Sequence, residues 1–174
     1  MTRSRKRSGI FAVTVVALLL AFTAGAALAV TAKRGGGPVT AVRTATDGVP
    51  VSTQSQTYVD VPGMTANRKV PSGQQALLII TFSAESVCYN TFASDPARAR
   101  CDVQVLVDGL PAAPGEVTFD SDVADLEYEA NSMQFVTGPV GSGLHTITVQ
   151  YRVRHSDAHF LLGPRTLTIL RSSV

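Results

Sequence analysis

The stretch Leu144–Arg154, LHTITVQYRVR, alternates apolar and polar side chains over its whole length. Successive side chains of a β-strand point to opposite faces of a sheet, so this pattern predicts a strand with one buried and one solvated face. His145 falls on the apolar side, where we expect a partly buried, hydrogen-bonded histidine rather than a catalytic one. The positions that we expect to face a core are His145, Ile147, Val149, Tyr151 and Val153.

The residues ahead of this strand are typical of a turn. Gly138–Gly143, GPVGSG, supplies glycines that accept the positive φ angles of tight turns. Before it, Asn131–Thr137, NSMQFVT, has the length and composition of a strand. We therefore predict that Asn131–Thr137 is the hairpin partner of Leu144–Arg154.

Similar strand signals recur along the chain. Gln75–Ser86 is a nearly continuous apolar run, as in a central strand covered on both faces. Cys101–Gly109 alternates valines and ends in Asp-Gly, a strong turn dipeptide. No stretch from Gln56 to Val174 has helical spacing. Short strands between Gly and Pro turns predict an all-β fold, an antiparallel β-sandwich of jelly-roll or Greek-key topology. Shorter strands are expected at Gln56–Val61, Glu116–Asp120 and Arg165–Arg171.

Residues 1–29 have the composition of an export signal. Four basic residues within the first seven positions precede a long uncharged apolar run, and small residues end it at Ala27 and Ala29. We expect a signal peptide cleaved after Ala29. The alternative is an uncleaved membrane anchor, because about 20 apolar residues span a bilayer. Under both interpretations the rest of the chain is secreted or lies on the extracellular side of the cell membrane.

The charge of the chain changes once this leader is set aside. Four of the 15 Lys and Arg residues belong to the leader, which leaves 11 basic against 13 acidic side chains and a formal charge near −2. Without a basic stripe, nucleic acid is not an expected partner. Residues 30–55 are rich in Gly, Thr, Val and Ser and predict a flexible linker. Residues 56–174 then form one sandwich domain of ordinary size.

The chain contains two cysteines, Cys88 and Cys101. In an exported protein such a pair predicts a disulfide, which would stabilise a loop of this size by about 3 kcal/mol. A redox pair favours a C-x-x-C spacing, and zinc needs two further ligands that the sequence does not offer. Free or intermolecular thiols and a reactive or metal-binding pair remain alternatives to a structural disulfide.

Four motifs, in this order, carry a resemblance to a known group of proteins: TYVDVPGM, VPSGQQALLIITFSAESVC, CDVQVLVDG and GLHTITVQYRV. They resemble a family of secreted actinobacterial proteins without an established activity, over most of Tyr58–Ile169. The resemblance implies a jelly-roll-like sandwich with a Cys88–Cys101 bridge and no catalytic residues. Members often carry Trp before the second cysteine and near the last strand, where this chain has Arg100 and Arg165. A role for an exposed aromatic at those places is therefore not expected here.

The most acidic stretch, FDSDVADLEYE, is a candidate calcium site. Calcium binds six to eight oxygen ligands, and Asp120, Asp122 and Asp125 could supply several of them. The spacing does not match an EF-hand loop. The alternative is a solvated acidic loop, and no other cofactor is expected.

The segment RHSDAHF contains three residue types of a hydrolase triad. Neighbouring residues of an extended chain point apart, so we do not expect a triad from His155, Ser156 and Asp157. His155, Asp157 and His159 share parity, but a straight strand holds the two histidines about 13 Å apart, too far to share one metal ion. We therefore expect a solvated loop, with a metal or binding site as the alternative.

Two aromatic residues between the cysteines have two interpretations. Tyr89 and Phe92 are expected either to form an apolar lid over their loop or to be exposed aromatics that bind a ligand. If they meet the acidic stretch and the histidines at one end of the sandwich, these segments form a candidate pocket.

The sequence favours an exported, non-enzymatic β-sandwich with a binding or structural role. Its expected partner is an unknown protein, a cell-wall glycan or another copy of itself in a homo-oligomer. The membrane is a partner only through an uncleaved N-terminal segment. The alternative function is an extracellular hydrolase that acts on a polymer through loop carboxylates or histidines. We assign no catalytic residue from the sequence.

Overall fold

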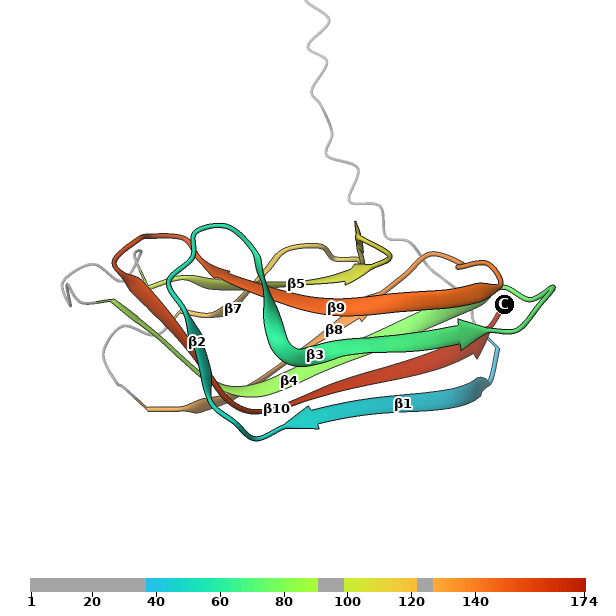
Figure 1. Ribbon diagram of the computed structural model, residues 1–174, viewed down its shortest axis with the longest axis horizontal. Coiled ribbons are helices and arrows are strands. Elements are labelled where there is room, and N and C mark those ends of the chain that lie inside the picture. The colour runs from blue at the N-terminus through green and yellow to red at the C-terminus, as the bar shows by residue number, and fades with distance from the viewer. Residues whose placement is uncertain (1–36, 91–98, 122–126) are drawn as a thin grey trace, which may run out of the picture. The chain divides into compact units, whose positions relative to one another are not determined.

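The computed structural model describes residues 37–90, 99–121 and 127–174, and these residues form two antiparallel sheets that pack face to face (Figure 1). The expected leader, residues 1–29, lies outside the described residues. No helix that could cross a membrane occurs in the part of the chain that the structure describes. The strands are β1 (Val39–Asp47), β2 (Val51–Thr53), β3 (Val59–Val70), β4 (Ala76–Asn90), β5 (Cys101–Val107), β6 (Leu110–Pro111), β7 (Val117–Asp120), β8 (Glu129–Val136), β9 (Gly143–Val153) and β10 (Ala158–Ser173).

The strands are connected as a jelly roll. Sheet A has the order β1-β10-β4-β8, with β2 also paired to β10. Sheet B has the order β3-β9-β5-β6, with β7 also paired to β5. The antiparallel pairs β1·β10, β3·β9, β4·β8 and β5·β7 are nested one inside the next along the chain. Nested pairs of this kind arise when one long hairpin folds over on itself, as in a jelly roll. The predicted all-β sandwich is therefore confirmed.

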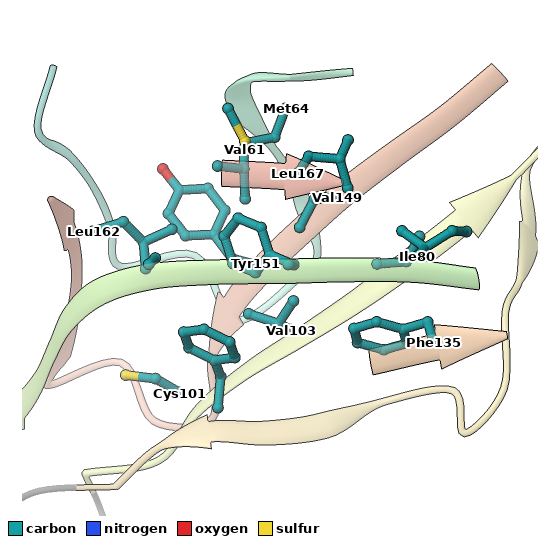
Figure 2. Close-up of a cluster of buried hydrophobic side chains, with 14 of the residues drawn as sticks. Val61, Met64, Ile80, Cys101, Val103, Phe135, Val149, Tyr151, Leu162 and Leu167 are labelled. Carbon is teal, nitrogen blue, oxygen red and sulfur yellow. The ribbon is translucent and has the colours of Figure 1, made fainter. Parts of the chain in front are cut away.

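The core fills the space between the sheets, as the alternation in β9 predicts. Ile147, Val149 and Val153 are fully buried and Tyr151 nearly so, whereas Arg152 on the other face is half-buried. Figure 2 shows side chains from both sheets that converge on this layer. Among them are Val61, Met64, Ile80, Val103, Phe135, Leu162 and Leu167, all at most 1% exposed.

The predicted hairpin between Asn131–Thr137 and Leu144–Arg154 is wrong. Strand β8 pairs with β4 in sheet A, whereas β9 pairs with β3 and β5 in sheet B. The glycine-rich segment between them therefore crosses from one sheet to the other. A turn of this composition is compatible with both connections, and only the nested pairing of the whole chain distinguishes them.

The linker predicted for residues 30–55 is wrong over much of its length. Strand β1 pairs with the second half of β10, and β2 pairs with its first half. The side of β1 that faces sheet B carries Ala41, Arg43 and Ala45, and none of them is fully buried. Without large apolar side chains at alternate positions, this edge strand has the composition of a linker. Its backbone hydrogen bonds to β10 are what make it a strand.

Cys88 on β4 and Cys101 at the start of β5 form a disulfide, as predicted. Their sulfurs are 2.10 Å apart and both residues are fully buried. The bond joins sheet A to sheet B at the end of the sandwich where β4 ends and β5 begins. A disulfide is compatible with an oxidising compartment outside the cytoplasm.

A buried arginine links three irregular segments near one edge of sheet A. Arg165 is 2% exposed and follows the irregularity in β10 between Leu162 and Arg165. Its guanidinium donates to the carbonyls of Pro62, Val49 and Gly163 and to the Asp47 carboxylate, at 2.6–3.2 Å. One side chain thereby fixes the β1–β2 turn and the irregular part of β3 against β10.

Gly63 allows this close approach. It has a φ of +78°, and a Cβ atom at this position would lie 2.5 Å from the Asp47 carboxylate oxygen that Arg165 binds. Any other residue would therefore be strained in its backbone and would displace Asp47.

Candidate functional site

Two of the predicted segments meet at the disulfide end of the sandwich. Tyr89 and His159 are direct partners on β4 and β10, and their rings stack with centroids 4.8 Å apart and an interplanar angle of 4°. The side-chain nitrogen of Gln54 lies 2.7 and 2.9 Å from the two ring nitrogens of His159. The imidazole is thus held between an aromatic ring and an amide. Phe92 lies outside the described residues.

The structure does not group the histidines with other metal ligands among the described residues. His155 is exposed in the turn between β9 and β10, and Asp157 is half-buried two residues later. Within residues 37–90, 99–121 and 127–174, no three His, Cys, Asp or Glu side chains are grouped closely enough to hold a metal ion. His155 therefore lies in a solvent-exposed turn, as expected. His159, in contrast, is part of strand β10 and stacks on Tyr89.

Asp120, in the acidic stretch, is a buried strand residue and not part of a solvated loop. Asp120 ends strand β7, is 6% exposed and accepts a hydrogen bond of 2.6 Å from the buried Ser86 hydroxyl. Asn131 donates to the same hydroxyl at 2.9 Å. Asp120 also lines a polar cavity of about 360 Å³ with Glu129 and Asn131. Asp122 and Asp125 lie outside the described residues, so the calcium hypothesis remains a prediction.

The outer face of sheet B carries a cluster of charged side chains that pair with one another. The fully buried Asp102 carboxylate accepts from Arg154 at 2.7 Å and from Arg152 at 3.3 Å, and Glu116 binds both arginines at 2.8 Å. The hydrogen bond to Asp102, against a smaller effect of burial, raises the pKa of Arg154. Arg100 donates to Thr118 at 2.8 Å, and Thr118 in turn donates to Asp102. The charged groups of this network are paired with one another, so few of their hydrogen-bonding positions remain for a ligand.

A neighbouring aromatic is part of the same network. Arg152 lies 4.8 Å from the centre of the Tyr58 ring, within cation–π range. Burial and the nearby Glu116 raise the pKa of Tyr58 above its usual value. The phenol is therefore neutral at physiological pH and acts here as a packing partner for the guanidinium.

The outer face of sheet A is different, because uncharged polar side chains align across four strands. One row runs Thr46–Thr166–Ser83–Ser132 from β1 through β10 and β4 to β8. The next polar row, two residues along each strand, is Thr44–Thr168–Thr81–Gln134. We call these eight side chains the hydroxyl face. The four on the edge strands are exposed and the four on the central strands are half-buried, so the described residues leave this face open.

A groove and an apolar row border the hydroxyl face. The first row lies in a shallow groove of about 490 Å³ that Pro164 and Gly48 also line. Beyond the second row, Val42, Leu170, Ile79 and Val136 form an apolar row in the same register. The prediction that Gln75–Ser86 is covered on both faces is therefore wrong. Strand β4 is central, but its outer side is part of this open surface.

Sequence reasoning missed the hydroxyl face, although a local signal existed. Three strands carry hydroxyl residues at alternate positions, in TAT of β1, TLT of β10 and TFS of β4. Alternation alone shows only that these residues share a face of their own strand. The alignment of the four strands requires the pairing register, which the sequence does not contain.

At the opposite end, His145 and Asp108 form the partly buried pair expected for His145. The His145 Nδ1 lies 2.6 Å from the Asp108 carboxylate, and its Nε2 lies 2.8 Å from the Gly141 carbonyl. Burial of the ring lowers its pKa, but the bonds to Asp108 and Gly141 outweigh burial and raise the pKa of His145. Both partners accept hydrogen bonds, so the doubly protonated ring satisfies both.

This pair predicts a small pH dependence of stability. Because the folded pKa of His145 is raised, the pair contributes fully below about pH 6.5 and loses its contribution as the pH rises through the folded pKa. Asp108 is 47% exposed, so we expect a loss below about 1 kcal/mol. Thermal unfolding from about pH 6 to pH 8 should show the decrease in wild type and H155Q and not in H145Q. An equal decrease in H145Q would contradict this assignment.

Comparisons with known proteins show a distant structural similarity. No family model and no curated protein matches this chain. Among solved structures, the fold is similar to part of the dimeric latent PorU from Porphyromonas gingivalis, with a TM-score of 0.35 and 11% sequence identity. The similarity covers 80% of this chain and 14% of PorU, so this chain spans a small part of that protein's length.

Proposed function

We propose that this protein is an exported, non-enzymatic β-sandwich module that binds an extracellular or cell-surface partner through the hydroxyl face of sheet A. The observation that carries this proposal is the open face itself, with three complete rows of side chains and a groove across four strands. The Arg152, Arg154, Asp102 and Glu116 side chains of sheet B, in contrast, bind one another. A surface with free hydrogen-bonding capacity supports a binding role.

Two features support export. The composition of residues 1–29 is that of a signal peptide or anchor. The Cys88–Cys101 disulfide is typical of proteins that fold outside the cytoplasm. Fractionation of the producing cells should place the protein in the medium or on the outer side of the membrane. Recovery of the reduced protein from the cytoplasm would contradict this part of the proposal.

The binding role is tested with cell envelopes and two matched variants. Thr81 and Thr168 are cross-strand neighbours in the centre of the hydroxyl face, and Thr65 and Thr148 are cross-strand neighbours on the outer face of sheet B. Valine keeps the shape and strand preference of threonine and removes its hydroxyl. We expect the purified protein and T65V/T148V to co-sediment with envelopes of the producing organism, and T81V/T168V to bind markedly less. Equal binding by all three proteins would overturn the proposal.

One observation favours a hydrolase as the second candidate. Asp120 and Glu129 line the same polar cavity, and a pair of carboxyl groups is what glycoside hydrolysis requires. This function predicts release of soluble sugars from envelope polymers, lost in both D120N and E129Q. Binding without release of sugars, unaffected by E129Q, would support the binding module instead.

A further inference from the structure

We propose that the hydroxyl face binds a neutral glycan that lies across the strands of sheet A. This inference rests on the proposed function and specifies the chemistry of the ligand. It follows from three properties of the surface: its hydrogen-bonding groups, its lack of charge and its apolar border.

The hydrogen-bonding groups match those of a sugar. Seven of the eight side chains are hydroxyls, each with one donor and two acceptor lone pairs, and the eighth is an amide. In the part of the chain that the structure describes, the bond between Ser83 and Ser132, at 2.8 Å, is the only side-chain hydrogen bond within the face. The remaining groups can both donate and accept. Sugar hydroxyls have the same dual capacity.

The surface is uncharged over all three rows. None of the twelve side chains in the two polar rows and the apolar row is ionisable. Arg165 and Asp47 both line the groove, but they form an ion pair at 2.9 Å. Arg165 is 2% exposed and also donates to three carbonyls. Recognition of phosphate or carboxylate groups uses Arg or Lys in direct contact. The neutral face therefore complements a neutral ligand and not a polyanion.

The apolar row completes the match. Val42 is 58% exposed, and it continues across the sheet through Leu170 and Ile79 to Val136. A sugar ring is itself amphipathic, because its C–H groups form an apolar face and its hydroxyls project from the ring edge. A glycan that lies along the rows would place C–H groups on the apolar row and hydroxyls on the polar rows.

The dimensions favour a chain over a single sugar. Strands are about 4.8 Å apart and alternate residues of one strand are about 6.7 Å apart. The two polar rows therefore form a strip about 14 Å long and about 7 Å wide. Several consecutive sugar units are needed to contact all four strands.

The experiment is affinity gel electrophoresis of the purified protein in gels that contain soluble polysaccharides. The neutral panel is β-glucan, mannan, galactan and xylan, and the polyanions are polygalacturonate and dextran sulfate. We expect at least one neutral polymer to retard the wild type and T65V/T148V equally, at low and high salt. Loss of two hydroxyls should weaken binding of T81V/T168V by about tenfold. Circular dichroism will confirm that both variants are folded.

Three outcomes would overturn the inference: no retardation by any neutral polymer, retardation by polyanions alone that salt abolishes, or equal weakening in T65V/T148V.

These outcomes can be distinguished from a failure of the proposed function. If T81V/T168V still reduces envelope binding and protease treatment of the envelopes removes their binding capacity, the partner is a protein. The hydroxyl face would then remain a binding surface and the glycan assignment would be wrong.

Discussion

Replacement of Arg165 by methionine is expected to lower the free energy of unfolding by about 3–5 kcal/mol, the largest effect that we predict for one substitution. The guanidinium is almost fully buried and binds Asp47 and three backbone carbonyls. Methionine fills a similar volume but leaves these acceptors without their donor, and unpaired buried polar groups are costly. Urea denaturation under oxidising conditions measures the change.

Two further variants make this prediction specific. R165K keeps the positive charge but cannot reproduce the planar set of donors, so we expect an intermediate loss. R171M removes another arginine of β10, which is half-buried and donates to Thr40 and Lys69 in an exposed position. Its loss should stay below about 1 kcal/mol. A stability of R165M equal to that of R171M would show that the buried arginine does not hold these segments together.

Removal of the disulfide is the second large effect. The double variant C88S/C101S is expected to lose about 3 kcal/mol, because a cross-link between residues 13 apart restricts the unfolded chain. The two cysteines join the sheets at one end, so unfolding should remain a single transition. Reductant should destabilise the wild type by a similar amount and leave C88S/C101S unchanged. A wild type that is insensitive to reductant during denaturation would contradict a stabilising role for the bond.

The fold class could be predicted because it depends on local patterns. The alternation in Leu144–Arg154 and the Asp108–Gly109 turn are properties of short segments, and the structure shows β9 and a turn with positive φ at both residues. Strand β1 could not be predicted in the same way. Its inward side chains include no large apolar group, and only its partner β10 identifies it as a strand.

The candidate surfaces depended on register, which local sequence does not contain. Tyr89 and His159 were separate candidates, and only the β4–β10 pairing makes them a stacked pair. Asp120 lies in a stretch with the composition of an acidic loop, but it ends strand β7 and accepts a hydrogen bond from Ser86. The hydroxyl face draws on four strands that are distant along the chain. Local sequence predicts parts of β4, β8 and β10 as strands, but it predicts neither β1 nor the alignment of the four strands.

The position at which the partner binds can be observed directly by methyl NMR. Methyl NMR of the protein reports each threonine separately while a soluble polysaccharide fraction extracted from the envelopes is added. We predict shifts for the methyls of Thr81, Thr166 and Thr168, with those of Thr65 and Thr148 unchanged. Shifts confined to sheet B would contradict the claim that the hydroxyl face of sheet A is the binding surface.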